Sequence, residues 1–362
     1  PSDVYVQFNG ATAGNSRVVS VDSAANLRGL YFRNTTNASL GFTFSGAGTL
    51  TVGRGGLVNY DIARQTLNAS LQLGDHQYWN GGVGGVTLSN LNSNGKLLEF
   101  AGAGTNRITG NLSGSGGLAV SGGMMEMTGT NSYSGRTWIH AGKLAVDGRI
   151  EASSSVVVGT YGVLGGSGHV AAISGSGSID PGQSPGILTA PSVDPQGGLD
   201  FNFEFTGLNP AYSEAFNSVN DLLRLTAVTP FTASLGTVNA VNVYFSFSSL
   251  APGTIYTGAF YTDQISDFLA SIDEAVFNYY VTADGAGEVT YNGADYDVYT
   301  DEQIEVSTTE QTADFSGGTV NGRVTQFRVV PEPSAYALLL FAAGFCAVVA
   351  WRKRRATKPL KG

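Results

Sequence analysis

Cysteine and histidine are scarce in this sequence. The single cysteine, Cys346, excludes an intrachain disulfide. The three histidines, His76, His140 and His169, lie far apart along the chain, and no pair has the spacing of metal ligands. We therefore expect a chain that folds without disulfide bonds, binds no cofactor and has no histidine- or cysteine-based metal site.

Charged residues are also few, at 13% of the chain against about 25% in an average globular protein. Residues 1–330 hold 13 of the 19 basic residues and 27 of the 28 acidic ones, a net charge of −14. Such an acidic body repels phosphate groups, which excludes nucleic acid as a partner. The charge suits an exported protein, for which divalent cations are compatible partners.

Glycine and apolar residues are plentiful instead. The chain holds 50 glycines, about twice the usual share, and 42% apolar residues, enough to bury a core. Glycine, serine, threonine and asparagine separate short apolar runs throughout, which is typical of many short strands joined by tight turns. The composition predicts an all-β protein.

A long apolar run stands near the C-terminal end. Residues 335–351 (AYALLLFAAGFCAVVAW) carry no charge and, as a helix, would span roughly 25 Å, close to the thickness of a bilayer core. Four basic residues follow directly: Arg352, Lys353, Arg354 and Arg355. By the positive-inside rule this end remains in the cytoplasm and the body faces outward. An ordinary tail anchor is one interpretation of this run.

The residues before that run support a more specific interpretation. Pro331, Glu332 and Pro333 form a short helix-resistant segment at the membrane surface, accessible to a protease. Pro-Glu-Pro, a transmembrane helix and an arginine-rich end together resemble the PEP-CTERM sorting signal. The resemblance implies that an exosortase in the inner membrane of a Gram-negative bacterium recognises Pro331–Pro333 and cleaves nearby. It also implies release to the cell surface or into an exopolysaccharide matrix. Because the chain starts at Pro1 without an apolar leader, we interpret it as a mature form.

A repeated pattern of glycine, short strand and polar turn runs over residues 46–188. Three of the strands begin at Gly95, Gly117 and Gly142, with spacings of 22 and 25 residues, within the range of solenoid coils. The strands alternate apolar and small polar residues, so each has one buried face. A right-handed parallel β-helix is the expected fold, and a glycine-rich β-sandwich is the alternative.

Residues 127–146 (MTGTNSYSGRTWIHAGKLAV) carry a second resemblance. They are similar to the autotransporter-associated β-strand repeat, whose pattern runs approximately LTGxNTYxGGTTxxxGTLxV. Weaker matches extend the resemblance over residues 106–190. Arg136 and Trp138 depart from the pattern, which places the local turn geometry in question. The resemblance implies a β-helix of the passenger type, with no catalytic residues in the repeat itself.

The composition changes at a proline- and glycine-rich junction, residues 191–198. We therefore divide the chain into a β-helix at 1–190, a β-rich cap or sandwich at 199–329 and the sorting signal at 330–362. Residues 199–205 and 241–247 alternate aromatic and polar residues as half-buried strands do. Residues 263–275 have the apolar spacing of a helix.

Few residues suggest chemistry. Tyr78 and Trp79 form a polar-aromatic cluster with Asp75 and His76 and are candidates for stacking on sugar rings. Asp295, Asp297 and Asp301 are weak candidates for a Ca²⁺ site, without the spacing of an EF-hand. Other acids are scattered, and we expect His140 and Lys143 to lie on the surface. The scattered candidates are Asp61, Asp75, Glu99, Glu126 and Asp147.

The sequence thus predicts a non-enzymatic structural or adhesive protein, displayed at the cell surface or in the extracellular matrix. Its partners are expected to be an exosortase and the inner membrane during sorting, then exopolysaccharide or the cell envelope. A polysaccharide-binding or polysaccharide-degrading enzyme on the same scaffold is the alternative. An autotransporter passenger is disfavoured, because residues 199–330 are too few for a translocator barrel. The sequence leaves the oligomeric state open.

Overall fold

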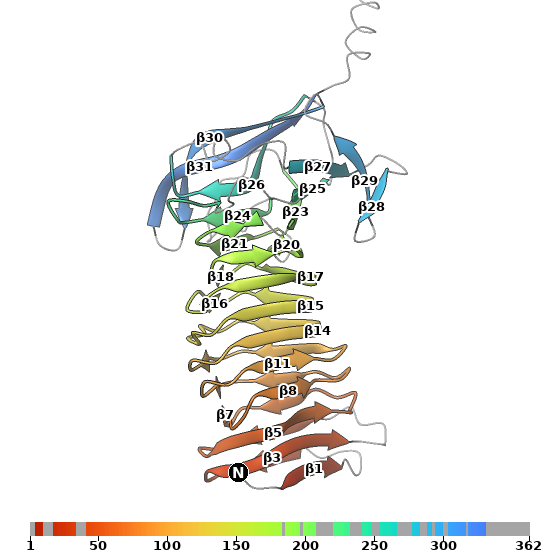
Figure 1. The fold of residues 1–362 in the computed structure, drawn as a ribbon, viewed down its shortest axis with the longest axis vertical. Helices are drawn as coiled ribbons and strands as arrows, with labels where there is room; N and C mark the ends of the chain where they lie inside the picture. The colour runs from red at the N-terminus through yellow and green to blue at the C-terminus, as the bar shows by residue number, and fades with distance from the viewer. Residues whose placement is uncertain are drawn as a thin grey trace, which may run out of the picture.

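The computed structural model describes most of residues 4–330 (Figure 1). The described ranges are 4–9, 17–33, 41–182, 185–195, 198–207, 220–231, 241–247, 253–265, 277–282, 288–291, 294–299, 303–315 and 318–330. Within them the regular structure is entirely β, arranged as a solenoid of about nine turns. The all-β parallel solenoid predicted from the sequence is confirmed, and the sandwich alternative is wrong. Of the described residues, no helix is long and apolar enough to cross a membrane.

Three ladders of parallel strands form the sides of the rod. The first ladder contains, in stacking order, β1 (Tyr5–Asn9), β3 (Ala25–Arg33), β5 (Thr49–Asn59), β8 (Gln77–Asn80), β11 (Leu98–Ala101), β14 (Leu118–Met127), β15 (Thr137–Val146), β17 (Val156–Gly166), β19 (Ile173–Gly175) and β22 (Val193–Asp194). Strands β3, β5, β14, β15 and β17 are long enough to turn a corner and join two ladders.

The second ladder contains β2 (Arg17–Ser20), β4 (Phe42–Ser45), β6 (Gln65–Leu67), β9 (Val86–Leu88), β12 (Thr105–Ile108), the second halves of β14, β15 and β17, then β20 (Ser178–Pro181), β23 (Asp200–Phe205), β25 (Val241–Phe247) and β27 (Phe277–Thr282). The third contains the first halves of β3 and β5, then β7 (Ser70–Leu73), β10 (Leu91–Asn92), β13 (Leu112–Ser113), β16 (Arg149–Ile150), β18 (His169–Val170), β21 (Ile187–Ala190), β24 (Leu222–Leu225) and β26 (Tyr256–Thr262).

Antiparallel strands cover the last coils. On the second ladder, β29 (Ala294–Tyr299) pairs with β27 and with β28 (Val289–Tyr291). On the third, β31 (Gly318–Val329) lies between β26 and β30 (Ile304–Phe315). These strands form the wider top of the rod in Figure 1, which we call the cap. The parallel ladders themselves pass through the predicted junction at 191–198, because β20 pairs with β23 and β21 with β24.

From β5 to β17 the strand register gives coils of 19 to 22 residues. Leu98 lies beside Leu118, and Leu118 beside Thr137. The spacings of 22 and 25 residues between Gly95, Gly117 and Gly142 therefore do not measure the coils that hold these glycines. Gly117 precedes a strand of the first ladder, whereas Gly142 lies beside Gly162 at the corner before the second. The two glycines occupy different places in their coils.

Inward side chains stack in columns from coil to coil. One column on the second ladder is fully buried. Its members are Leu67, Leu88, Ile108, Met127 and Val146. Each fully buried side chain of this kind contributes about 1.5–3 kcal/mol relative to an exposed one. A coil has no partner for these groups within itself, so stacking supplies the core.

Glycine is required where the chain passes from the second ladder to the third. At Gly129, a side-chain Cβ would lie 1.9 Å from the carbonyl oxygen of Gly110, one coil earlier. Gly148 and Gly168 continue this column: a Cβ at either position would lie 2.1 Å from the carbonyl oxygen of the preceding glycine of the column. The backbones of successive coils therefore approach too closely for any side chain at this corner.

The repeat-like segment 127–146 builds its coil with buried polar groups. Asn131 donates from Nδ2 to the carbonyl oxygens of Gly129 (2.8 Å) and Arg149 (3.1 Å), and its Oδ1 accepts from the amide of Leu112 (2.9 Å). Tyr133 is fully buried, with its hydroxyl 2.6 Å from Oγ1 of Thr137. Asn131 thus joins its coil to the coils before and after it, while Tyr133 fixes the turn of its own coil.

The cap has an aromatic core. The ring of Phe327 lies 4.4 Å from that of Phe245 and 4.9 Å from that of Phe205, and Phe260 packs edge-on against Phe201 and Phe203. The alternation predicted for residues 199–205 is present in β23, whereas in β25 Val243, Tyr244 and Phe245 are all buried, so the strict alternation predicted for 241–247 is wrong. Most of the helix predicted at 263–275 and all of the transmembrane helix predicted at 335–351 lie outside the described residues.

Candidate functional site

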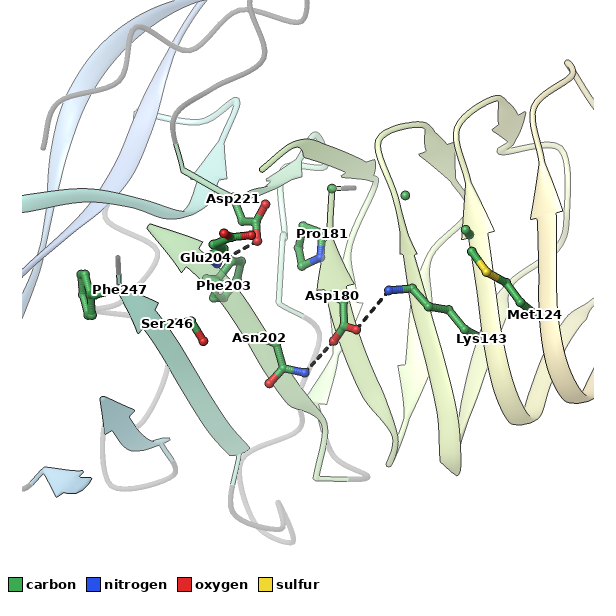
Figure 2. A pocket seen from close by; sticks show the side chains of 13 residues that line it. Met124, Lys143, Asp180, Pro181, Asn202, Phe203, Glu204, Asp221, Ser246 and Phe247 are labelled. Carbon is green, nitrogen blue, oxygen red and sulfur yellow. Dashed lines mark hydrogen bonds and ion pairs between the residues drawn. The ribbon is translucent and has the colours of Figure 1, made fainter. Parts of the chain in front are cut away.

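A polar cleft of about 630 Å³ lies on the outer side of the second ladder, where the solenoid meets the cap (Figure 2). Strands β14, β15, β20, β23 and β25 supply most of its wall. The lining residues are Met124, Lys143, Ala145, Gly166, Asp180, Pro181, Gly182, Asn202, Phe203, Glu204, Asp221, Ser246 and Phe247. It therefore combines three carboxyl groups, one amine and one amide with an apolar end.

Asp180 lies between the side chains of Lys143 and Asn202. Its Oδ2 is 3.3 Å from Nζ of Lys143, and its Oδ1 accepts a hydrogen bond of 2.6 Å from Nδ2 of Asn202 (Figure 2). Both side chains of the ion pair are about one-third exposed, so solvent weakens their attraction. Together Lys143, Asp180 and Asn202 connect β15, β20 and β23 across the outer surface of the ladder.

Asp221 is the most deeply buried acid of the cleft. Its Oδ1 accepts from the amide of Gly186 (2.8 Å) and its Oδ2 from the amide of Glu204 (2.7 Å). Burial raises the pKa of Asp221 to about 7, and the charges of Glu204 and Asp180 add to the rise. The two amide hydrogen bonds oppose that shift, because they favour the charged form. Asp221 therefore fixes the backbone amides of two neighbouring segments.

The aromatic pair predicted to stack on sugars is divided by the strand. Tyr78 is 51% exposed on the outer side of β8, whereas Trp79 is fully buried, packs edge-on against Phe100 and donates from Nε1 to Gln77. Successive residues of a strand face opposite sides. Only Tyr78 offers a ring to a ligand.

The calcium candidates lie at the edge of the cap. Asp295 and Asp297 are two apart on β29, and Oδ1 of Asp295 accepts from the hydroxyl of Thr290 (2.7 Å). Asp301 lies outside the described residues. Over the part of the chain that the structure describes, no three histidine, cysteine or acidic side chains gather as metal ligands.

The scattered acids have separate local partners. Asp61 is buried in its own turn, Asp75 pairs with Arg54, Glu126 with Arg107, and Ser121 donates to Glu99. Asp147 accepts from the amide of Ser167.

The two predicted surface residues lie apart. His140 is exposed and stacks on Trp138, whose ring also lies under the guanidinium of Arg136. Lys143 lines the cleft, alongside acids that sequence reasoning did not single out. Asp180, Glu204 and Asp221 come from three coils of unequal length, so no fixed spacing connects them.

The described part of the chain ends next to the sorting segment. Val329 is the last residue of β31, and the amide of Val330 donates to the carbonyl oxygen of Gln303 (2.7 Å). The predicted recognition residues Pro331, Glu332 and Pro333 and the basic cluster Arg352–Arg355 lie outside the described residues.

Comparison with known proteins gives two similarities. A family model for the PEP-CTERM protein-sorting motif matches residues 329–355. An 80-residue stretch, 21% of this chain, is 41% identical to an extracellular serine protease of Serratia marcescens, of which it covers 8%. That short overlap carries no activity over to this chain. The family match, together with the solenoid, identifies the chain as a β-solenoid protein that carries a PEP-CTERM sorting motif, the signature of an exported protein processed at the membrane by an exosortase.

Proposed function

We propose that this protein is a non-enzymatic structural or adhesive component of the cell surface or extracellular matrix. The observation that carries the proposal is the sorting motif at 329–355, joined directly to an elongated solenoid. Such a rod presents three long faces instead of one pocket. It suits contact with an extended partner, such as exopolysaccharide or the cell envelope.

Sorting at the membrane explains the charge distribution. The acidic body remains outside, while Arg352, Lys353, Arg354 and Arg355 hold the other end in the cytoplasm until cleavage. The released product would lack the apolar run and its basic end. It would carry the solenoid and cap into the surface layer or the matrix.

Intact mass tests this proposal. The protein is isolated from the surface fraction and the medium of its native host, and from a strain without the exosortase. We expect a product that ends near residues 331–334 in the normal strain alone. A full-length protein in the membranes of both strains would instead favour a permanent tail anchor.

The cleft gives a second candidate function, hydrolysis of a polysaccharide. Asp221, whose pKa burial raises to about 7, has the character of a general acid, and Asp180 and Glu204 line the same cleft. However, the amides of Gly186 and Glu204 occupy both oxygens of Asp221. This is why we prefer the structural role. Release of reducing ends from the host exopolysaccharide, abolished by Asp221→Asn, would favour the enzyme.

A further inference from the structure

The end of β31 is held from both sides. In the sheet, residues 323–327 of β31 lie between β26 and β30, so both edges of this part of the strand are paired. Two hydrogen bonds hold its last residues: the amide of Val330 donates to Gln303 (2.7 Å), and the amide of Gly253 donates to the carbonyl of Val329 (2.8 Å). The folded body therefore holds the chain until one residue before Pro331.

The side chains at this end add to the attachment. Val329 is 5% exposed and lies beside Ile304, while Arg328 and Glu305 form an ion pair on the outer face. Two residues earlier, Phe327 is buried in the aromatic core of the cap. No flexible spacer separates this core from the sorting motif.

The sorting motif and the folded body overlap. The family match begins at residue 329, so Val329 and Val330 belong to the motif and to the sheet at once. Extended peptide segments are commonly bound through their main-chain hydrogen-bonding groups, as an added strand. Two of those groups, the carbonyl of Val329 and the amide of Val330, already have partners in the folded body.

We infer that the end of β31 is a gate for processing: the sorting enzyme engages the motif only after residues 328–330 separate from residues 303–305 and from Gly253. This inference rests on the proposed sorting function. It adds that the rate of processing depends on the stability of the cap, not on the motif alone. Opening is local, because Phe327 remains anchored while the last residues leave the sheet.

A disulfide across the gate tests this. Gln303 and Val330 form a hydrogen-bonded pair, so the adjacent pair Ile304 and Val329 is a non-hydrogen-bonded one, with Cα atoms about 4.5 Å apart. We would introduce Ile304→Cys and Val329→Cys together, in a full-length chain with Cys346→Ser. The oxidised protein is expected to remain unprocessed in membranes that contain the exosortase. Reduction of the same sample is the matched control and is expected to restore cleavage.

A spacer provides the opposite test. Six glycine and serine residues followed by a second Val-Val pair, inserted between Val330 and Pro331, move a complete copy of the motif away from the sheet and leave β31 unaltered. We expect processing to become about tenfold faster or more, since opening no longer breaks the two hydrogen bonds that hold the end. The variant Glu332→Ala, combined with the spacer, is expected to abolish processing and shows that the enzyme reads the motif.

The outcomes separate the two claims. Loss of processing on oxidation together with a gain from the spacer supports the gate. Equal processing of the oxidised, reduced and spacer proteins overturns it, with sorting intact. If the unaltered chain is cleaved equally with and without the exosortase, the sorting function itself is wrong.

Discussion

Replacement of Asn131 by alanine tests how the solenoid holds its turns. The side chain is 3% exposed and makes three hydrogen bonds, reaching Gly129 in its own coil, Arg149 in the next and Leu112 in the one before. A buried hydrogen bond contributes about 1 kcal/mol, and a buried amide left without an acceptor costs about as much again. Asn131→Ala is therefore expected to lower the free energy of unfolding by about 3 kcal/mol.

Urea unfolding, followed by circular dichroism and by hydrogen exchange at the amide of Leu112, measures this effect. Ser132→Ala is the matched control, because Ser132 is exposed and its hydroxyl contacts only Asn111, at 3.2 Å. The control is expected to change stability by less than about 0.5 kcal/mol. Equal midpoints for the two variants, with no faster exchange at Leu112, would refute the claim that Asn131 joins the coils.

Three further changes test other parts of the fold. Gly129→Ala, which places a Cβ 1.9 Å from a carbonyl oxygen, is expected to cost about 3 kcal/mol of stability in the same urea assay. Arg224→Ala removes a buried ion pair with Asp263 that is made of two hydrogen bonds (2.9 Å each), and we expect it to lower the free energy of unfolding by about 3 kcal/mol. Arg328→Ala removes the exposed ion pair with Glu305 and should cost less than about 1 kcal/mol. Thermal melts of the two variants check this difference. Because burial raises the pKa of Asp221 from 3.8 to about 7, the folded protein binds this proton more tightly than the unfolded chain does. The free energy of unfolding should then fall by up to about 4 kcal/mol between about pH 4 and pH 7 and level off above, and Asp221→Asn should remove that slope in urea titrations against pH.

The fold class follows from local patterns that the sequence displays openly. Alternation in residues 199–205 predicts a half-buried strand, and β23 has that burial, whereas Tyr244 on β25 is buried on the face expected to be exposed. Glycine before each strand predicts tight corners, as at Gly142, where φ is +78°. Such features depend on neighbours along the chain, so one sequence suffices to predict them.

The coil register and the cleft depend instead on contacts between distant residues. Gly117 and Gly142 look equivalent in the sequence, yet they stand at different corners. Asp180 and Asp221 meet at one cleft because the chain between them makes a coil of unusual length. Tyr78 and Trp79 have similar chemistry, and only the direction of β8 decides that one is exposed and the other buried. No local pattern contains this information.

Stability and sorting can be separated experimentally because each coil contacts only its neighbours. Asn131 lies between β14 and β15, and the strands β17, β20 and β23 separate this coil from β25 below the cap, so a local opening there does not reach β31. Asn131→Ala should weaken the solenoid and leave processing at the motif unchanged. Phe327→Ala, which empties the aromatic core beneath the end of β31, should instead speed processing. If both variants changed processing equally, it would depend on global unfolding and not on the strand that joins the cap to the motif.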